Sequence, residues 1–95
     1  MISIFDIIDL MNRRQQRTLN AIFEDPVRSD ILWSDIIHLF VALGAEISPG
    51  NGSRVRVVLN DRKAIFHRPH PEKETDKGEV KSVRRFLFEA GIIDR

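Results

Sequence analysis

The sequence GSRVRVVLNDRKAIFHRPH, residues 52–70, contains two short runs in which apolar and polar side chains approximately alternate. The first run covers residues 54–59 and the second covers residues 63–67, with Asn60-Asp61 between them. Such alternation is typical of a half-buried strand, and Asn and Asp tolerate the positive φ angles of a tight hairpin turn. The stretch therefore predicts an antiparallel β-hairpin, which Pro69 ends because proline has no N–H to donate to a strand ladder.

The two faces of this predicted hairpin differ in charge. Because side chains alternate between the faces of a strand, one face receives the apolar residues Val55, Val57 and Leu59. The other face receives Arg54 and Arg56 together with Val58. We therefore expect an apolar underside that packs on a core and a cationic upper side.

Length and composition limit the class of protein. The chain has 95 residues, of which 42% are hydrophobic, and no cysteine. Such a chain forms one domain with a modest core, and the lack of cysteine excludes disulfides, cysteine zinc sites and a thiol nucleophile. Residues 1–48 hold four Lys/Arg against seven Asp/Glu, whereas residues 49–95 hold eleven against seven. A basic half that contains the hairpin indicates an anionic partner such as nucleic acid, the alternative being an ordinary solvated surface.

Apolar residues at helical spacing predict two helices at the start of the chain. Residues 1–11 read as a short amphipathic helix, which packs on the domain or on a second copy as a homodimer contact. They lack the positive start of a targeting segment and the length of a membrane span. Residues 12–24 read as a second helix that Pro26 stops. Its Arg13, Arg14 and Arg17 are either solvated, which is the favoured reading, or face an anion.

The remaining elements complete an α+β domain. Ser34 is the expected N-cap of a helix that Gly44 ends, with an apolar face that includes Val41, and a short strand follows at residues 45–48. Asp76 or Gly78 begins a last helix that Gly91 ends. Residues 27–33 and 70–77 read as connectors. We expect a helical extension over residues 1–33, followed by an α-β-β-β-α domain over residues 34–95 with a three-stranded antiparallel sheet.

Between residues 34 and 92 the chain carries an ordered set of short motifs, namely Leu43-Gly44, Gly52-Ser53, Pro69-His70, Lys73-Glu74, Lys77-Gly78 and Ala90-Gly91-Ile92. In order and spacing they resemble the HicA family of bacterial toxins, mRNA interferases of type II toxin–antitoxin pairs. The resemblance implies a fold similar to double-stranded-RNA-binding domains, in agreement with the element order. It also implies ribosome-independent cleavage of mRNA, a HicB antitoxin as partner and a cytoplasmic location.

One position departs from the pattern of that family. Family members carry a catalytic histidine directly after the Gly-Ser pair, and this chain has Arg54 there. The family's catalytic role therefore does not transfer to position 54. Residues 1–33 also have little counterpart in a typical short family member.

Cleavage of RNA without a metal needs a base for the 2′-hydroxyl proton, an acid for the leaving oxygen and cations for the phosphorane charge. His67 and His70, at the exit of the hairpin, are the candidate catalytic residues because imidazole titrates near neutrality. The candidate RNA-binding residues are Arg54, Arg56, Lys63, Arg68 and Lys73. The structural alternatives are a packed sheet residue for His67, a loop-ordering residue for His70 and a solvated sheet face for the arginines.

Three functions therefore stay open. The favoured one is an mRNA-cleaving toxin that uses no metal and no cofactor. The second is a module that binds RNA, or only its antitoxin, without cutting, and the third is a small structural domain that dimerises through residues 1–11. A His-x-x-His metal site at His67 and His70 is not favoured, because only two nitrogen ligands are close in sequence.

Overall fold

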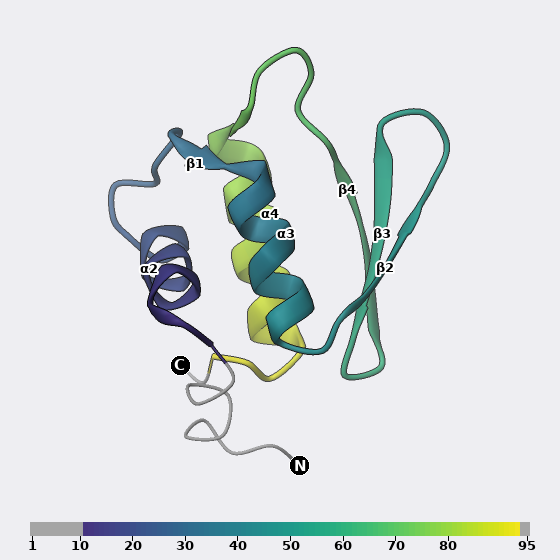
Figure 1. Cartoon of the computed structure of the whole chain (residues 1–95), viewed down its shortest axis with the longest axis horizontal. Helices are drawn as coiled ribbons and strands as arrows, with labels where there is room; N and C mark the ends of the chain where they lie inside the picture. The colour runs from purple at the N-terminus through teal and green to yellow at the C-terminus, as the bar shows by residue number, and fades with distance from the viewer. Residues whose placement is uncertain (1–10, 94–95) are drawn as a thin grey trace.

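The computed structural model describes residues 11–93 (Figure 1). Its elements are, in chain order, α2 (Arg13–Ile22), β1 (Ile31–Leu32), α3 (Trp33–Ala42), β2 (Glu46–Pro49), β3 (Arg54–Leu59), β4 (Arg62–His67), β5 (Glu74–Thr75) and α4 (Lys77–Glu89). The α+β class and the order of helix, three strands and helix are confirmed. The helix predicted for residues 1–11 lies outside the described residues, apart from Met11. None of the helices in residues 11–93 is long and apolar enough to cross a membrane.

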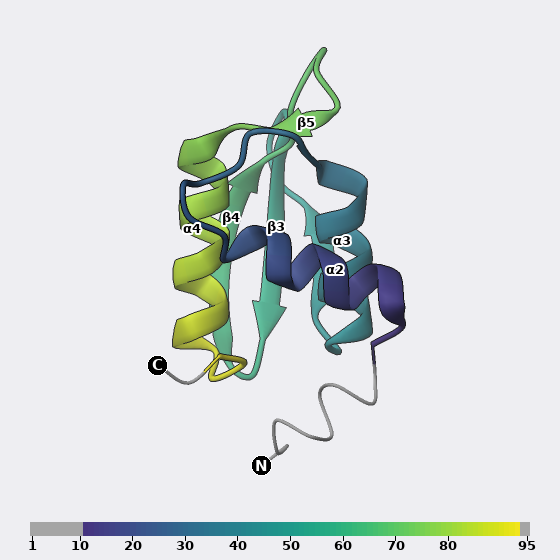
Figure 2. The same cartoon turned by 90° about the vertical axis from the view of Figure 1, so that its left-hand side faces the viewer.

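The elements form three layers. The antiparallel sheet, in the order β2-β3-β4, packs with one face on α3 and α4. Helix α2 crosses this helix pair on the side away from the sheet (Figure 2). No described element covers the opposite face of the sheet, which we call the outer sheet face. The strand register assigns to it Glu46, Ser48, Arg54, Arg56, Val58, Lys63, Ile65 and His67.

Asn60 and Asp61 close the hairpin as the sequence predicted. Their φ angles are 49° and 65°, in the left-handed region that a two-residue hairpin turn requires. The turn sets the register of β3 and β4, which pairs Leu59 with Arg62 and Arg54 with His67. The Asn60 side chain also donates a hydrogen bond of 2.9 Å to the carbonyl of Ala90, which attaches the hairpin tip to the end of α4.

The core lies between the sheet and the α3–α4 pair, around the ring of Phe66. The centroid of this ring lies 6.3 Å from that of Trp33, 5.7 Å from that of Phe40 and 5.6 Å from that of Phe86. All four rings are buried. The apolar residues Val80, Val83, Leu87 and Ala90 of the last helix, which recur at helical spacing, are also buried.

Helix α3 begins earlier than the sequence predicted. The expected N-cap was Ser34, but the cap is Leu32, which makes no side-chain hydrogen bond, and Trp33 is the first helical residue. The N–H of Trp33 donates to the carbonyl of Lys73 at 3.0 Å, so a distant loop supplies a partner that a capping side chain would otherwise supply. Val41, predicted for the apolar face, is 59% exposed, and Leu39 is buried instead.

Two short strands lie in segments that were predicted to be connectors. Strand β1 pairs antiparallel with β5, joining Ile31 to Thr75 and Leu32 to Glu74. The pair brings the start of α3 next to the start of α4. Asp76, one of the two starts predicted for the last helix, caps α4, since its carboxylate accepts a hydrogen bond of 2.8 Å from the N–H of Glu79.

Helix α2 begins at Asn12, which forms a capping box with Gln15. It ends at Ile22, so Pro26 does not stop it as predicted, because the helix has already ended in a turn at Phe23. Arg84 of α4 donates hydrogen bonds to the carbonyls of Ile22 and Glu24. These bonds join the end of α2 to the helix pair.

We expect the substitution Arg84→Met to lower the free energy of unfolding by about 1.5–3 kcal/mol, the usual contribution of hydrogen bonds from a charged donor. The side chain of Arg84 is only 21% exposed, so solvent replaces these bonds poorly. Denaturant unfolding measures the change. Arg85→Met is the control, because Arg85 is exposed and makes no such bond within residues 11–93. Equal changes for both variants would contradict the role of Arg84.

Candidate functional site

The outer sheet face brings together four of the seven predicted site residues. Arg54 and His67 lie directly opposite each other on β3 and β4. Residues paired in this way share a face, with Cβ atoms about 4.5–5.5 Å apart. Arg56 lies two residues further along β3, opposite Ile65, and Lys63 lies opposite Val58. All four predicted residues are exposed.

No carboxylate of residues 11–93 forms an ion pair with Arg54, Arg56 or Lys63 of this face. Within residues 11–93, the ion pairs join Arg14 to Asp35, Arg28 to Glu24 and Asp30, and Arg84 to Asp25. None of them includes Arg54, Arg56 or Lys63. Glu46 is the one acidic residue among the eight of the outer sheet face. It belongs to β2 and lies opposite Val58 of β3. The face therefore offers more cations than anions to a partner.

Both candidate histidines line one hollow at the end of β4, with a volume of about 450 Å³. Its walls are formed by Ser29, His67, Arg68, Pro69, His70, Glu72, Glu74, Asp76 and Glu79. The carboxylate of Glu79 accepts a hydrogen bond of 2.9 Å from the backbone N–H of His67, which holds the end of β4 against α4. The structure thus brings His67 and His70 to one hollow. No three His, Asp or Glu side chains of residues 11–93 are placed to hold a metal ion.

Arg68 and Lys73, the other two predicted cations, lie beside the start of α3 rather than on the outer sheet face. The N–H of Arg68 donates to the carbonyl of Ser53 at 2.9 Å, which extends the contact between β3 and β4 beyond the last pair of their ladder. Arg68 lines a hollow with Trp33 and Arg54, and Lys73 lines a neighbouring hollow with Trp33 and Arg68. The predicted cationic surface is therefore divided between a face and an edge of the sheet.

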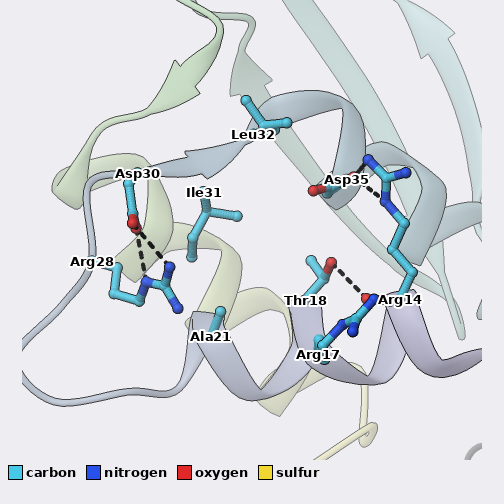
Figure 3. Close-up of a pocket in the computed structure, with 9 residues that line it drawn as sticks. All are labelled: Arg14, Arg17, Thr18, Ala21, Arg28, Asp30, Ile31, Leu32 and Asp35. Carbon is cyan, nitrogen blue, oxygen red and sulfur yellow. Dashed lines mark hydrogen bonds and ion pairs between the residues drawn. The ribbon is translucent and has the colours of Figure 1, made fainter.

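A further hollow, of about 380 Å³, lies between α2 and β1 (Figure 3). Its arginines are Arg14, Arg17 and Arg28. Sequence reasoning took the first two as solvated or facing an anion, and Arg14 donates to the Asp35 carboxylate at 3.0 Å. Arg28 binds the Asp30 carboxylate with two hydrogen bonds, of 2.7 and 2.9 Å, and thereby lowers the pKa of Asp30. Because two of the three guanidinium groups are already paired, this hollow is a weaker anion site than the outer sheet face.

Comparison with protein families gives a match that covers most of the described residues. The family model for the HicA toxin of bacterial toxin-antitoxin systems matches residues 33–92. This range starts at the first residue of α3 and contains the three-stranded sheet, both candidate histidines and α4, but not α2. Searches of curated proteins and of solved structures find no significant match. The matched range covers well over half of the chain, and the chain therefore belongs to the HicA toxin family.

Proposed function

We propose that this chain is an mRNA-cleaving toxin that binds RNA on its outer sheet face and cuts it beside Arg54 and His67. The observation that carries the proposal is the strand register, which sets the exposed imidazole of His67 opposite Arg54. In the HicA toxins that this chain resembles, the catalytic histidine follows the Gly-Ser pair directly. Here that position is Arg54, and the neighbouring strand supplies an imidazole next to it.

The proposed chemistry uses groups that the chain itself holds. His67 removes the proton of the 2′-hydroxyl, and the freed oxygen forms a bond to phosphorus. The bond from phosphorus to the 5′-oxygen breaks, and that oxygen takes a proton from the imidazolium of His70. The products are a 2′,3′-cyclic phosphate and a 5′-hydroxyl end. Arg54 stabilises the extra negative charge of the pentacovalent phosphorus, because a guanidinium binds phosphate oxygens well and stays charged.

The remaining cations hold the RNA in place. Arg56 and Lys63 extend the outer sheet face along β3 and β4, and Arg68 and Lys73 extend it around the edge of the sheet. Contacts of this kind go to phosphates, so they fix position without reading sequence. We expect binding that depends strongly on salt and weakly on base identity.

The substitutions Arg54→Gln and Arg56→Gln are each expected to weaken RNA binding and to reduce the slope of log affinity against log salt by about 1. The reason is that each removes one phosphate contact and the counterions released with it. Fluorescence anisotropy with labelled RNA at several salt concentrations measures the slope. Arg13→Gln is the matched control, since Arg13 is exposed on α2, which lies on the side of the helix pair away from the sheet. Unchanged slopes for both outer-face variants would contradict RNA binding there.

Induced expression in bacteria tests the proposed function as a whole. We expect growth arrest together with mRNA fragments that carry 5′-hydroxyl ends. Intact growth and intact transcripts, in a strain where a HicA toxin with the usual histidine is active, would overturn the enzyme proposal.

A second candidate is a module that binds RNA without cutting it. The observation in its favour is Arg54 itself, which replaces the histidine of the family pattern. This candidate predicts salt-sensitive retention of RNA with no cleavage products.

Membership in a toxin–antitoxin family implies an antitoxin partner, and we propose a HicB-like protein. Rescue of growth by a co-expressed HicB-like protein tests that pairing. The homodimer predicted through residues 1–11 involves residues outside the described ones.

A further inference from the structure

Two neighbouring hollows lie at the start of α3, and Arg54 is the one residue of their linings that the proposed cleavage step uses. The first has a volume of about 270 Å³ and lies between α3 and the loop that joins β2 to β3. The second has a volume of about 300 Å³ and lies beside the loop after β4. Trp33 and Arg68 line both hollows, so the two are neighbours that share a wall. Small-molecule sites begin at about 300 Å³, so each hollow is close to the size that holds one flat group.

The hollows combine apolar walls with cations. The apolar walls of the first include Ile37, Ile47 and Val55, and those of the second include Leu32 and Pro69. Arg54 and Arg68 belong to the first hollow, and Arg68 and Lys73 to the second.

None of these three cations forms an ion pair with a carboxylate of residues 11–93. Glu72 is the one acidic residue that lines either hollow. Apolar walls beside unpaired cations suit a ligand with a flat apolar part and an attached phosphate, which is the chemistry of a nucleotide.

Arg54 connects these hollows to the outer sheet face. It lies opposite His67 in the sheet and also lines the first hollow. A phosphate that Arg54 holds beside His67 therefore has its neighbouring nucleotide at this hollow. A base enters such a space only when it is unstacked and unpaired, since bases inside an A-form duplex are closed to side chains in the deep groove.

We propose that the two hollows receive the nucleotide next to the cleaved bond, so that the substrate is single-stranded RNA rather than duplex RNA. The inference rests on the proposed function, because it takes the outer sheet face as the surface that binds RNA. It adds a substrate class and a subsite. Arg68 and Lys73 then contact the phosphates on either side of the inserted nucleotide.

Trp33 reports directly on these hollows, because it lines both and is the one tryptophan of the chain. The probe is a short single-stranded oligoribonucleotide with 2′-O-methyl groups, which block attack by the 2′-oxygen. We expect the emission of Trp33 to change over the concentration range in which the anisotropy of the labelled probe rises. A duplex of the same sequence is expected to bind about tenfold more weakly and to leave the emission unchanged, because its bases are stacked and cannot enter the hollows.

Ser34→Phe tests the subsite from the protein side. Ser34 is exposed and lines the second hollow, so a phenyl group there competes with the inserted base. We expect about tenfold weaker binding of the single strand and no change in Trp33 emission on titration. The matched control is Ser82→Phe, an exposed helical serine that lines neither hollow. Lys73→Gln, compared with Lys81→Gln, tests the same subsite through charge and does not depend on how a phenyl group fits.

The outcomes separate this inference from the proposed function. If RNA binds and Arg54→Gln weakens it, while Trp33 emission stays constant and Ser34→Phe binds the single strand as the wild type does, the inference is overturned and the proposed function stands. Equal affinity for single strand and duplex overturns the inference in the same way. If neither form of RNA binds the wild-type protein, the proposed function itself fails.

Discussion

Replacing His67 by glutamine is expected to lower the rate of RNA cleavage about 10²–10⁴-fold, the range for loss of a positioned proton-transfer group. The side chain is exposed, and the described contact of this residue with Glu79 uses the backbone N–H, which the substitution keeps. The fold should therefore survive. Arg54 and Arg56 are unchanged, so binding of an uncleavable RNA should also survive. Single-turnover cleavage and anisotropy separate the two effects.

His38→Gln is the control for this experiment, because His38 is exposed on α3 and lines none of the hollows described above. Cleavage at the wild-type rate by the His67 variant would remove His67 from the mechanism. His70→Gln, measured in parallel, then shows whether His70 performs both proton transfers, because in that case this variant alone loses cleavage. Loss of RNA binding by the His67 variant would instead assign this residue to phosphate contact.

Phe66→Ala is expected to lower the free energy of unfolding by about 3–5 kcal/mol, the usual cost of removing a buried phenyl ring. The ring is 2% exposed and packs against the rings of Trp33, Phe40 and Phe86. Since domains of this size are stable by about 5–15 kcal/mol, the change removes a large part of the total. Thermal unfolding should show a loss of about 4–8 °C for each kcal/mol.

Phe88→Ala supplies the comparison, because Phe88 is 49% exposed on α4. Its effect should stay within about 0.5 kcal/mol, as is usual for surface positions. Similar losses in the two variants would mean that the aromatic cluster is not the core. The result also bears on the site, since Phe66 precedes His67 directly in β4 and packs inward where His67 points outward. Phe66 thus fixes the strand that presents the imidazole.

Local chemistry made three features predictable: the hairpin, the last helix, and the position of Arg54 beside the strand that ends at His67. Asn60 and Asp61 accept positive φ angles, and a two-residue turn leaves one register for the strands it joins. That register decides which face carries Arg54 and His67. Asp76 and Gly91 mark the ends of α4 by capping preferences that act within a few residues.

The pairing of β1 with β5 was not predictable, because strands of two residues are too short to show any alternation. The start of α3 was missed for a related reason. The partner of the Trp33 N–H is the carbonyl of Lys73, which is distant in sequence, so no local sequence motif predicts this bond. Val41 was misplaced because α3 is apolar on most sides, and spacing alone does not then identify the buried stripe.

The small β1–β5 sheet has a practical consequence for anyone who trims this protein. The loop that carries His70 and Lys73 is tied down at one end by the bond from Arg68 to Ser53 and at the other by the pairing of β5 with Ile31 and Leu32. Those two partners precede residue 33, where similarity to the family begins. A fragment cut at that limit would keep every proposed catalytic and RNA-binding residue but would lose the strand that pairs with the end of the loop carrying His70 and Lys73. The range that matches the family and the set of residues that the folded domain needs therefore begin at different positions in this chain.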